Sequence, residues 1–143
     1  MGFTTVLRLG TLTLALACTT HAMASEESQL VDSLNSYRSQ IQRCAGQALG
    51  ELPPLASDPR LILPATGMGD LQQALVKASY PMVNVQAIRL SGPRDGAAAM
   101  QAVRESFCQV VLDPQFVDVG ISREGREWRI VLARPLLSAR LGD

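Results

Sequence analysis

Residues 106–135, "SFCQVVLDPQFVDVGISREGREWRIVLARP", contain the clearest secondary-structure signals of the chain. In their second half, apolar and polar residues alternate from Val117 to Ile121, a turn-forming "SREGRE" follows, and the apolar "WRIVLA" returns. This pattern predicts a β-hairpin. Because Ile130 to Ala133 are all apolar, we expect the returning strand to be covered on both faces, in the interior of a sheet.

The first half of this stretch is expected to close a helix. Asp95 is a suitable N-cap, and Asp113-Pro114 is a stop signal. Between them, apolar residues recur at helical spacing, namely Ala99, Val103, Phe107 and Val110. The sequence therefore predicts one helix that runs through Phe107 and directs its ring at the core.

A strand is predicted before this helix, over "VNVQAIRLSG", residues 83–92. Its apolar residues alternate from Val83 to Ala87 and then shift by one position at Ile88. Such a change of phase predicts either a β-bulge or a strand covered on both faces. Gly92-Pro93 ends the strand.

Two more helices are expected towards the N-terminus. Ser25 is a suitable cap for the first, and its apolar face comprises Leu30, Leu34, Tyr37, Ile41 and Cys44. We expect this helix to end close to Cys44. Asp70 caps a second, short helix. The Pro- and Gly-rich connection between them, residues 45–68, should contain at most a short helical turn within 59–65.

The order helix, connection, helix, strand, helix and hairpin predicts an α+β fold. We expect an α-β-α sandwich, in which a central, mainly antiparallel sheet is covered by helices. The chain length suits a single domain, residues 25–143, and no internal repeat or linker divides it.

The first 24 residues indicate export. Arg8 precedes an apolar run, and small residues end at Ala24, which predicts a signal peptide over residues 1–24. A membrane anchor is the weaker alternative, because the apolar run is shorter than the roughly 20 residues that span a bilayer. Cys18 leaves a further alternative open, a lipoprotein anchored at that residue. The expected location is otherwise periplasmic or secreted.

Cleavage after Ala24 would leave two of the three cysteines, Cys44 and Cys108. An even pair in an oxidising compartment indicates a disulfide. Two buried free thiols are the alternative.

Residues 25–143 lack the usual groups of nucleophilic and metal chemistry. The single histidine, His21, lies in the predicted signal peptide. Without a histidine or a free thiol, the mature chain cannot form a Ser-His or Cys-His nucleophile and lacks the commonest transition-metal ligand. Its carboxylates are not spaced like those of a calcium loop. We therefore expect no metal site and no cofactor.

Net charge gives no case for binding nucleic acid or an anionic membrane, because 13 basic side chains balance 13 acidic ones. Five arginines near the predicted strands could form either an anion-binding patch or a solvated face: Arg89, Arg94, Arg123, Arg126 and Arg129. Acidic residues lie among them, so the solvated face is favoured. Trp128 alternates with Ile130, which places it in the core rather than in a stacking surface.

Short motifs along the chain resemble a known family. They are "LNSYRSQIQRC", "PPLASDPRLILPA", "ALVKASYPMVNVQAIRLSG" and the stretch quoted first. From Leu34 to about Pro135 the chain resembles a bacterial CAP domain, of the SCP-like superfamily of cysteine-rich secretory, antigen 5 and pathogenesis-related proteins. The matching positions are Asn35, Arg38, Pro54, Leu55, Asp58, Leu61, Ala65, Cys108, Leu112, Pro114, Phe116, Val119 and Gly120. The resemblance also implies that the two cysteines pair.

The best-known cleft of this family holds two histidines and acidic residues, proposed in some members to bind a divalent metal. Carried over by position, Met68 stands where the first histidine is expected and Gln86 where a glutamate is expected. Phe107 stands where the second histidine precedes the cysteine. The resemblance therefore implies a degenerate, more apolar cleft without its metal ligands.

These observations support two hypotheses about function. The first is an exported, non-catalytic CAP-like module that binds an envelope protein or a small apolar ligand in the cleft around Met68, Gln86 and Phe107. The alternative is an envelope enzyme that acts on cell-wall material through carboxylates, such as Glu105 and Asp113.

Overall fold

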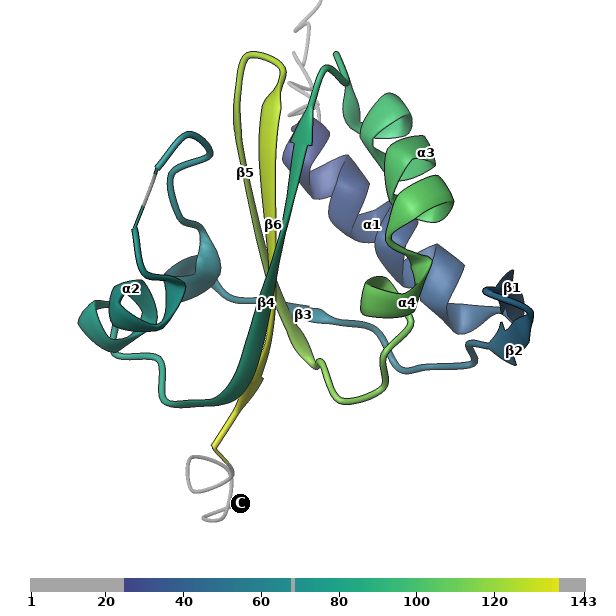
Figure 1. Cartoon of the computed structure of the whole chain (residues 1–143), viewed down its shortest axis with the longest axis horizontal. Helices are drawn as coiled ribbons and strands as arrows, with labels where there is room; N and C mark the ends of the chain where they lie inside the picture. Colours follow the sequence, from purple (N-terminus) through teal and green to yellow (C-terminus); the bar gives the residue numbers. More distant parts are fainter. Residues whose placement is uncertain (1–24, 68, 137–143) are drawn as a thin grey trace, which may run out of the picture.

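The computed structural model describes residues 25–67 and 69–136. The predicted signal peptide, Cys18 and Met68 lie outside the described residues. The described chain forms three layers, with a four-stranded sheet between two layers of helix (Figure 1). This arrangement confirms the predicted α-β-α sandwich.

The sheet has the strand order β3-β5-β6-β4. Its strands are β3 (Ala56–Ser57), β4 (Met82–Ser91), β5 (Asp118–Glu124) and β6 (Glu127–Pro135). Strands β4, β5 and β6 pair antiparallel, and β3 pairs parallel to β5. The predicted hairpin is therefore β5 with β6, and its returning strand lies inside the sheet as expected.

One face of the sheet is covered by α1 (Glu26–Ser39), α3 (Gly96–Ser106) and α4 (Cys108–Val111) (Figure 1). The helix α2 (Leu71–Lys77) and the 3-10 turn η1 (Pro59–Leu61) lie on the opposite face. The side chains of Ser25, Asp70 and Asp95 accept backbone N–H bonds at the starts of α1, α2 and α3, as their sequence positions predict.

Each face of the sheet has its own core. The first core, under α1, α3 and α4, includes Leu30, Leu34, Ile88, Met100, Val103, Phe116, Val119, Trp128, Ile130 and Leu132. The second core, under α2 and η1, comprises Leu61, Leu75, Tyr80, Val131 and Ala133. Successive residues of β6 thus enter opposite cores, which explains its unbroken apolar run.

The phase change in β4 has the same cause. Ile88 belongs to the first core, while Val85 packs against the second. The pairing of β4 with β6 is continuous from Asn84 to Ser91, and its one irregularity falls earlier, between Met82 and Asn84. Coverage on both faces, rather than a bulge at Ile88, therefore explains the pattern.

The first helix is shorter than predicted. It ends at Ser39, and Cys44 lies instead in β1 (Gln42–Cys44), which pairs with β2 (Gln47–Leu49) in a small separate sheet. Ala45 and Gly46, the two residues between these strands, both have positive φ, as a tight hairpin turn requires. Ile41, which seemed to extend the apolar face of the helix, is 63% exposed.

The helix predicted from Asp95 to Val110 is broken at Phe107. Its φ of −133° and ψ of 25° are not helical, and they separate α3 from α4. The ring of Phe107 is only partly buried, although it packs against the first core. The break starts a new turn of helix at Cys108, the residue that forms the disulfide.

Candidate functional site

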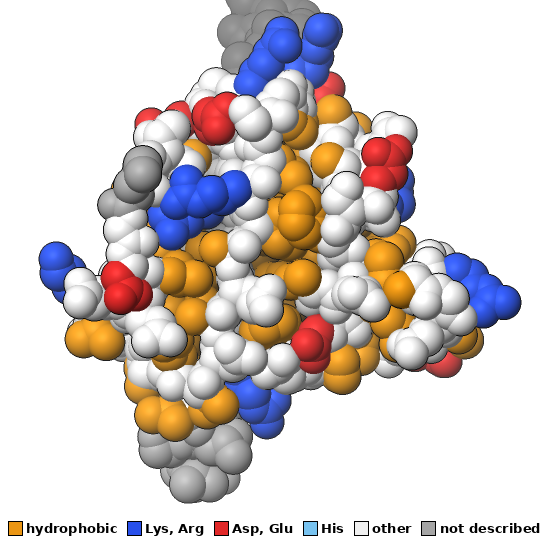
Figure 2. Space-filling view, in the orientation of Figure 1, with side chains coloured by type: hydrophobic (Ala, Val, Ile, Leu, Met, Phe, Trp, Pro, Cys, Tyr) orange, Lys and Arg blue, Asp and Glu red, His pale blue; other side chains and the backbone are white. Residues whose placement is uncertain are grey.

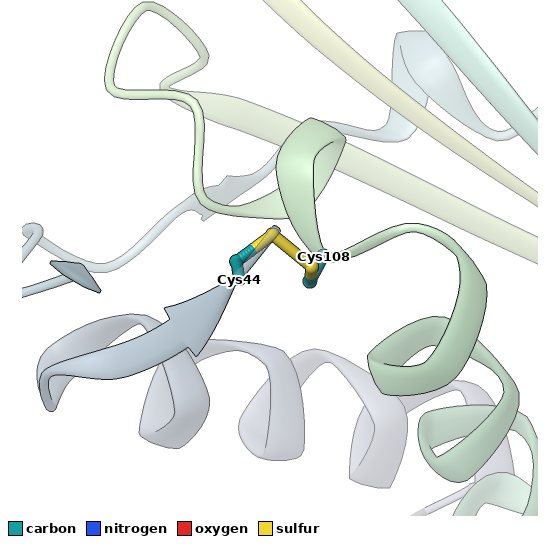
Figure 3. The surroundings of a disulfide bond; sticks show 2 residues. All are labelled: Cys44 and Cys108. Atoms are coloured by element: carbon teal, nitrogen blue, oxygen red, sulfur yellow. A yellow bond between two sulfur atoms is a disulfide. The ribbon is translucent and has the colours of Figure 1, made fainter. Parts of the chain in front are cut away.

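The predicted disulfide is present between Cys44 and Cys108. It joins the end of β1 to the start of α4 (Figure 3), with a Cα–Cα distance of 5.9 Å. Cys44 is 1% exposed. Neither cysteine is therefore available as a nucleophile or a metal ligand.

Of the three predicted cleft positions, Gln86 and Phe107 lie in the described chain, while Met68 lies outside it. Phe107 lines a pocket of about 320 Å³ beside the disulfide, together with Ala45 and Gln109. Gln86 is exposed on β4, and it faces the side of the first core because it pairs with Leu132. Gln86 is not among the residues that line the pocket beside Phe107.

Gly67 and Gly69 lie on the other side of the sheet from Phe107. Gly67 and Gly69 line a second pocket, with Asp70 of the α2 cap and Arg129 of β6. Arg129 faces this side because its neighbours in β6 along the same face, Val131 and Ala133, belong to the second core. The sheet therefore separates this pocket from the one beside Phe107.

Asn35 and Arg38, two polar positions of the family resemblance, have structural roles. The amide of Asn35 donates to the Leu55 carbonyl and accepts from the Leu55 N–H, at 3.2 and 2.7 Å. Arg38 is 2% exposed and donates to the carbonyls of Val111, Pro53 and Phe116, at 2.8, 3.2 and 3.3 Å. Burial lowers the pKa of the Arg38 guanidinium, against the opposing charge of Asp113. These residues fasten α1 to the connection at residues 53–55, to the end of α4 and to Phe116.

Tyr80 and Asp118 form a buried pair that the sequence did not reveal. The Tyr80 hydroxyl donates to an oxygen of Asp118 at 2.6 Å, and the two residues are 1% and 6% exposed. Burial, together with this bond to Asp118, raises the pKa of Tyr80 far above its usual range. The Arg60 guanidinium lies 4.8 Å from the centre of the Tyr80 ring and forms an ion pair with Asp58.

The two carboxylates considered for catalysis are each bonded to a glutamine. Glu105 accepts from the Gln101 side chain at 3.3 Å. Asp113 accepts from the Gln115 backbone and side chain at 3.0 and 2.9 Å. The described residues contain no group of three or more His, Cys, Asp or Glu side chains able to hold a metal ion.

Arg89 and Arg129 form a basic pair on the second face of the sheet. They are direct partners in the β4–β6 register, and Figure 2 shows basic side chains between β4 and the loop before α2. Arg129 is 6% exposed, so the predicted solvated face is wrong for this residue. The prediction for Trp128, 1% exposed in the first core, is confirmed.

Both arginines hold the loop before α2. Arg129 Nη1 donates to the Pro64 carbonyl at 3.1 Å. Arg89 donates to the carbonyls of Ala65 and Gly67. The pocket that Arg129 lines has a volume of about 190 Å³. Arg129 therefore lies against a cavity, although an arginine in a strand suggests solvent exposure. Its place opposite Arg89 could be inferred only from the register of the two strands.

The fold of the described chain is similar to that of SCP, or CAP, domains. A solved structure supports this assignment, an extracellular protein from Bacillus anthracis that contains a SCP domain. Its TM-score with this chain is 0.62 at 19% sequence identity, and the match covers 76% of this chain.

The match covers 40% of the Bacillus anthracis chain, so the chain described here corresponds to less than half of that protein. No protein-family model matches the sequence, and no curated protein matches it. In the part of the chain that the structure describes, no helix has the length and apolar character needed to cross a membrane.

Proposed function

We propose that this protein is an exported, non-catalytic module of CAP-like fold that acts by binding an envelope protein or a small apolar ligand. One observation carries the proposal. The fold is shared with an extracellular SCP-domain protein, yet residues 25–143 contain no histidine and both of their cysteines are in a disulfide. Neither a Ser-His nor a Cys-His nucleophile can form from this set.

The engagement of the carboxylates supports binding over catalysis. Asp58 is paired with Arg60, and Asp118 is bonded to Tyr80. Glu26 accepts from the Gly96 N–H, which joins the starts of α1 and α3. Acids held in such bonds maintain the fold, whereas most glycoside hydrolases need two that face a common cleft.

The pocket beside the disulfide is the surface that we propose for an apolar ligand or partner. Phe107 is partly exposed there, and Gln109 lies exposed at its rim. The disulfide fixes the start of α4 beside the pocket. Binding there would therefore cost less conformational entropy than binding to a flexible segment.

A photo-cross-linking residue placed at Gln109 tests this surface in the host. We expect a discrete cross-linked product that is lost in a Phe107→Ser variant. A cross-linker at Arg126, exposed in the β5–β6 turn, is the matched control and should give no such product. Equal products from both positions, or a Gln109 product that survives Phe107→Ser, would contradict the assignment.

The non-catalytic role has a separate test. The purified protein is incubated with cell-wall material from its host, and the soluble products are examined by mass spectrometry. We expect none. Turnover that disappears in a single Asp or Glu variant with an unchanged melting temperature would establish the enzyme instead.

A further inference from the structure

The exposed Arg89 and the buried Arg129 lie opposite each other on the second face of the sheet. Arg89 and Arg129 are cross-strand partners, and neither forms an ion pair among the described residues. Burial lowers the pKa of Arg129, and the positive charge of Arg89 lowers it further. Like charges directly opposite each other destabilise a sheet, so an unbalanced pair at this position calls for an explanation.

Arg129 also retains unused hydrogen-bond donors. Of its five N–H groups, one is bonded to a described residue, Pro64. Its Nε is buried without a partner in the described chain. A buried donor left unsatisfied destabilises the fold, and a ligand with acceptor oxygens would remove that cost.

Arg38 provides an internal comparison. Its Nε is also buried without a partner, but its two terminal nitrogens make three bonds to backbone carbonyls. The charge of Asp113 acts on it favourably. Arg129 differs, since it makes one bond to the described residues, the positive charge of Arg89 acts on it and it lines a cavity. The bond to the loop therefore does not by itself explain why an arginine is buried at position 129.

We propose that the pocket lined by Arg129 and Gly67, with Arg89 beside it, binds an oxyanion of the phosphate type. The inference rests on the proposed function, because it names a ligand class for a binding module. Two adjacent guanidinium groups supply two positive charges and planar sets of donors, which suit a dianionic phosphate better than a single carboxylate. The volume of about 190 Å³ leaves room for the anion.

Asp70 opposes this charge, because it lines the same pocket. One of its oxygens accepts from the N–H groups of Gln72 and Gln73 and so caps α2. An asparagine can replace aspartate as an N-cap with little loss of stability. Asp70→Asn therefore removes the opposing charge while the helix is kept.

Titration calorimetry of the mature protein with inorganic phosphate in low-salt buffer tests the proposal. We expect saturable binding that is weaker by roughly tenfold or more in Arg89→Gln, because charge-assisted bonds are lost. Arg126→Gln, which removes the same charge from an exposed turn, should leave binding unchanged. Asp70→Asn should tighten binding by roughly two- to fivefold.

Absence of saturable binding by the folded wild-type protein would overturn the proposal. So would equal losses in Arg89→Gln and Arg126→Gln, which would indicate a general charge effect. If Arg89→Gln fails to fold, the Asp70→Asn variant still tests the proposal. Phosphate binding that is unchanged or weaker in Asp70→Asn contradicts an anion in this pocket.

A parallel titration with glycerol 3-phosphate distinguishes the source of the phosphate group. Tighter binding of the ester supports the inference and indicates a phosphate monoester, such as a lipid headgroup fragment, whereas tighter binding of inorganic phosphate supports it and indicates the free anion. Hydrolysis of the ester would contradict the non-catalytic function. Loss of phosphate binding alone, with the Gln109 cross-link intact, would overturn only this inference.

Discussion

Arg38 shows how one buried guanidinium can hold several segments together, namely the end of α4 and two connecting segments. Its three bonds reach residues 15, 73 and 78 positions away along the chain. A residue of this kind cannot be recognised from periodicity, which places Arg38 on a helix among polar neighbours. The resemblance to CAP domains singled it out, while the structure supplies the physical reason for its presence.

Tyr80→Phe is expected to lower the free energy of unfolding by about 1–3 kcal/mol, because it leaves the carboxylate of Asp118 buried without its hydroxyl donor. Urea unfolding at neutral pH measures the change. Tyr37→Phe is the matched control, since no hydrogen bond of the Tyr37 hydroxyl is found in the described structure and its loss should have little effect. Equal effects of the two substitutions would show that the Tyr80–Asp118 bond contributes nothing.

The Asp58–Arg60 pair predicts a dependence of stability on pH. The side-chain hydrogen bond from Arg60 holds the pKa of Asp58 below its usual value. Since the folded pKa lies below the unfolded value of about 3.9, the contribution is complete above that value and is lost as the pH falls through the folded pKa.

Asp58→Asn should therefore be less stable than the wild type near neutral pH, and the difference should shrink in acid. Unfolding by urea at a series of pH values between about 6 and 2 measures it. A difference that stays constant over this range would show that the ion pair does not act through Asp58 ionisation.

At the scale of secondary structure, the three helix caps and the β5–β6 hairpin could be predicted, because each has a local signal in the sequence. The β1–β2 hairpin could not. Its turn uses Ala45 and Gly46 rather than Asn-Gly, and alanine at positive φ is unfavourable outside its tertiary context. The apolar spacing of Ile41 and Cys44 suggested further helix, although Ile41 is exposed.

The disulfide stabilises this hairpin and the start of α4 together. It closes a loop between residues 64 positions apart, which contributes about 4 kcal/mol in the loop-entropy treatment. Cys108→Ser, or reduction of the wild type, should lower the melting temperature by several degrees in a thermal denaturation followed by circular dichroism. An unchanged melting curve in both experiments would contradict a stabilising bond.

The contact between η1 and β5 depends on Gly120. A Cβ atom at this position would lie 2.3 Å from the carbonyl carbon of Leu61, so the backbone of η1 would have to move. Gly120→Ala should therefore destabilise the protein by about 2 kcal/mol or more. Gly69→Ala is the control, because nothing lies within 4 Å of its Cβ position, and a similar loss in both variants would contradict the close packing.

At the scale of the whole molecule, the fold class was predictable from the order of the elements and from the short family motifs. The candidate sites were much less so. The family resemblance placed Met68, Gln86 and Phe107 in one cleft, and this stays a prediction because Met68 lies outside the described residues. Arg89 and Arg129 lie opposite each other because of the register between β4 and β6. That register could not be read from the sequence before the two strands were known to pair.

We propose that this chain is an exported module that binds rather than catalyses. Native followed by denaturing mass spectrometry of the protein from the envelope of its host tests both parts of this proposal. We predict a chain that begins at Ser25, is two hydrogens lighter than its reduced form and carries a bound ligand or partner in the native spectrum. A chain that retains residues 1–24, with free thiols and nothing bound, would contradict it.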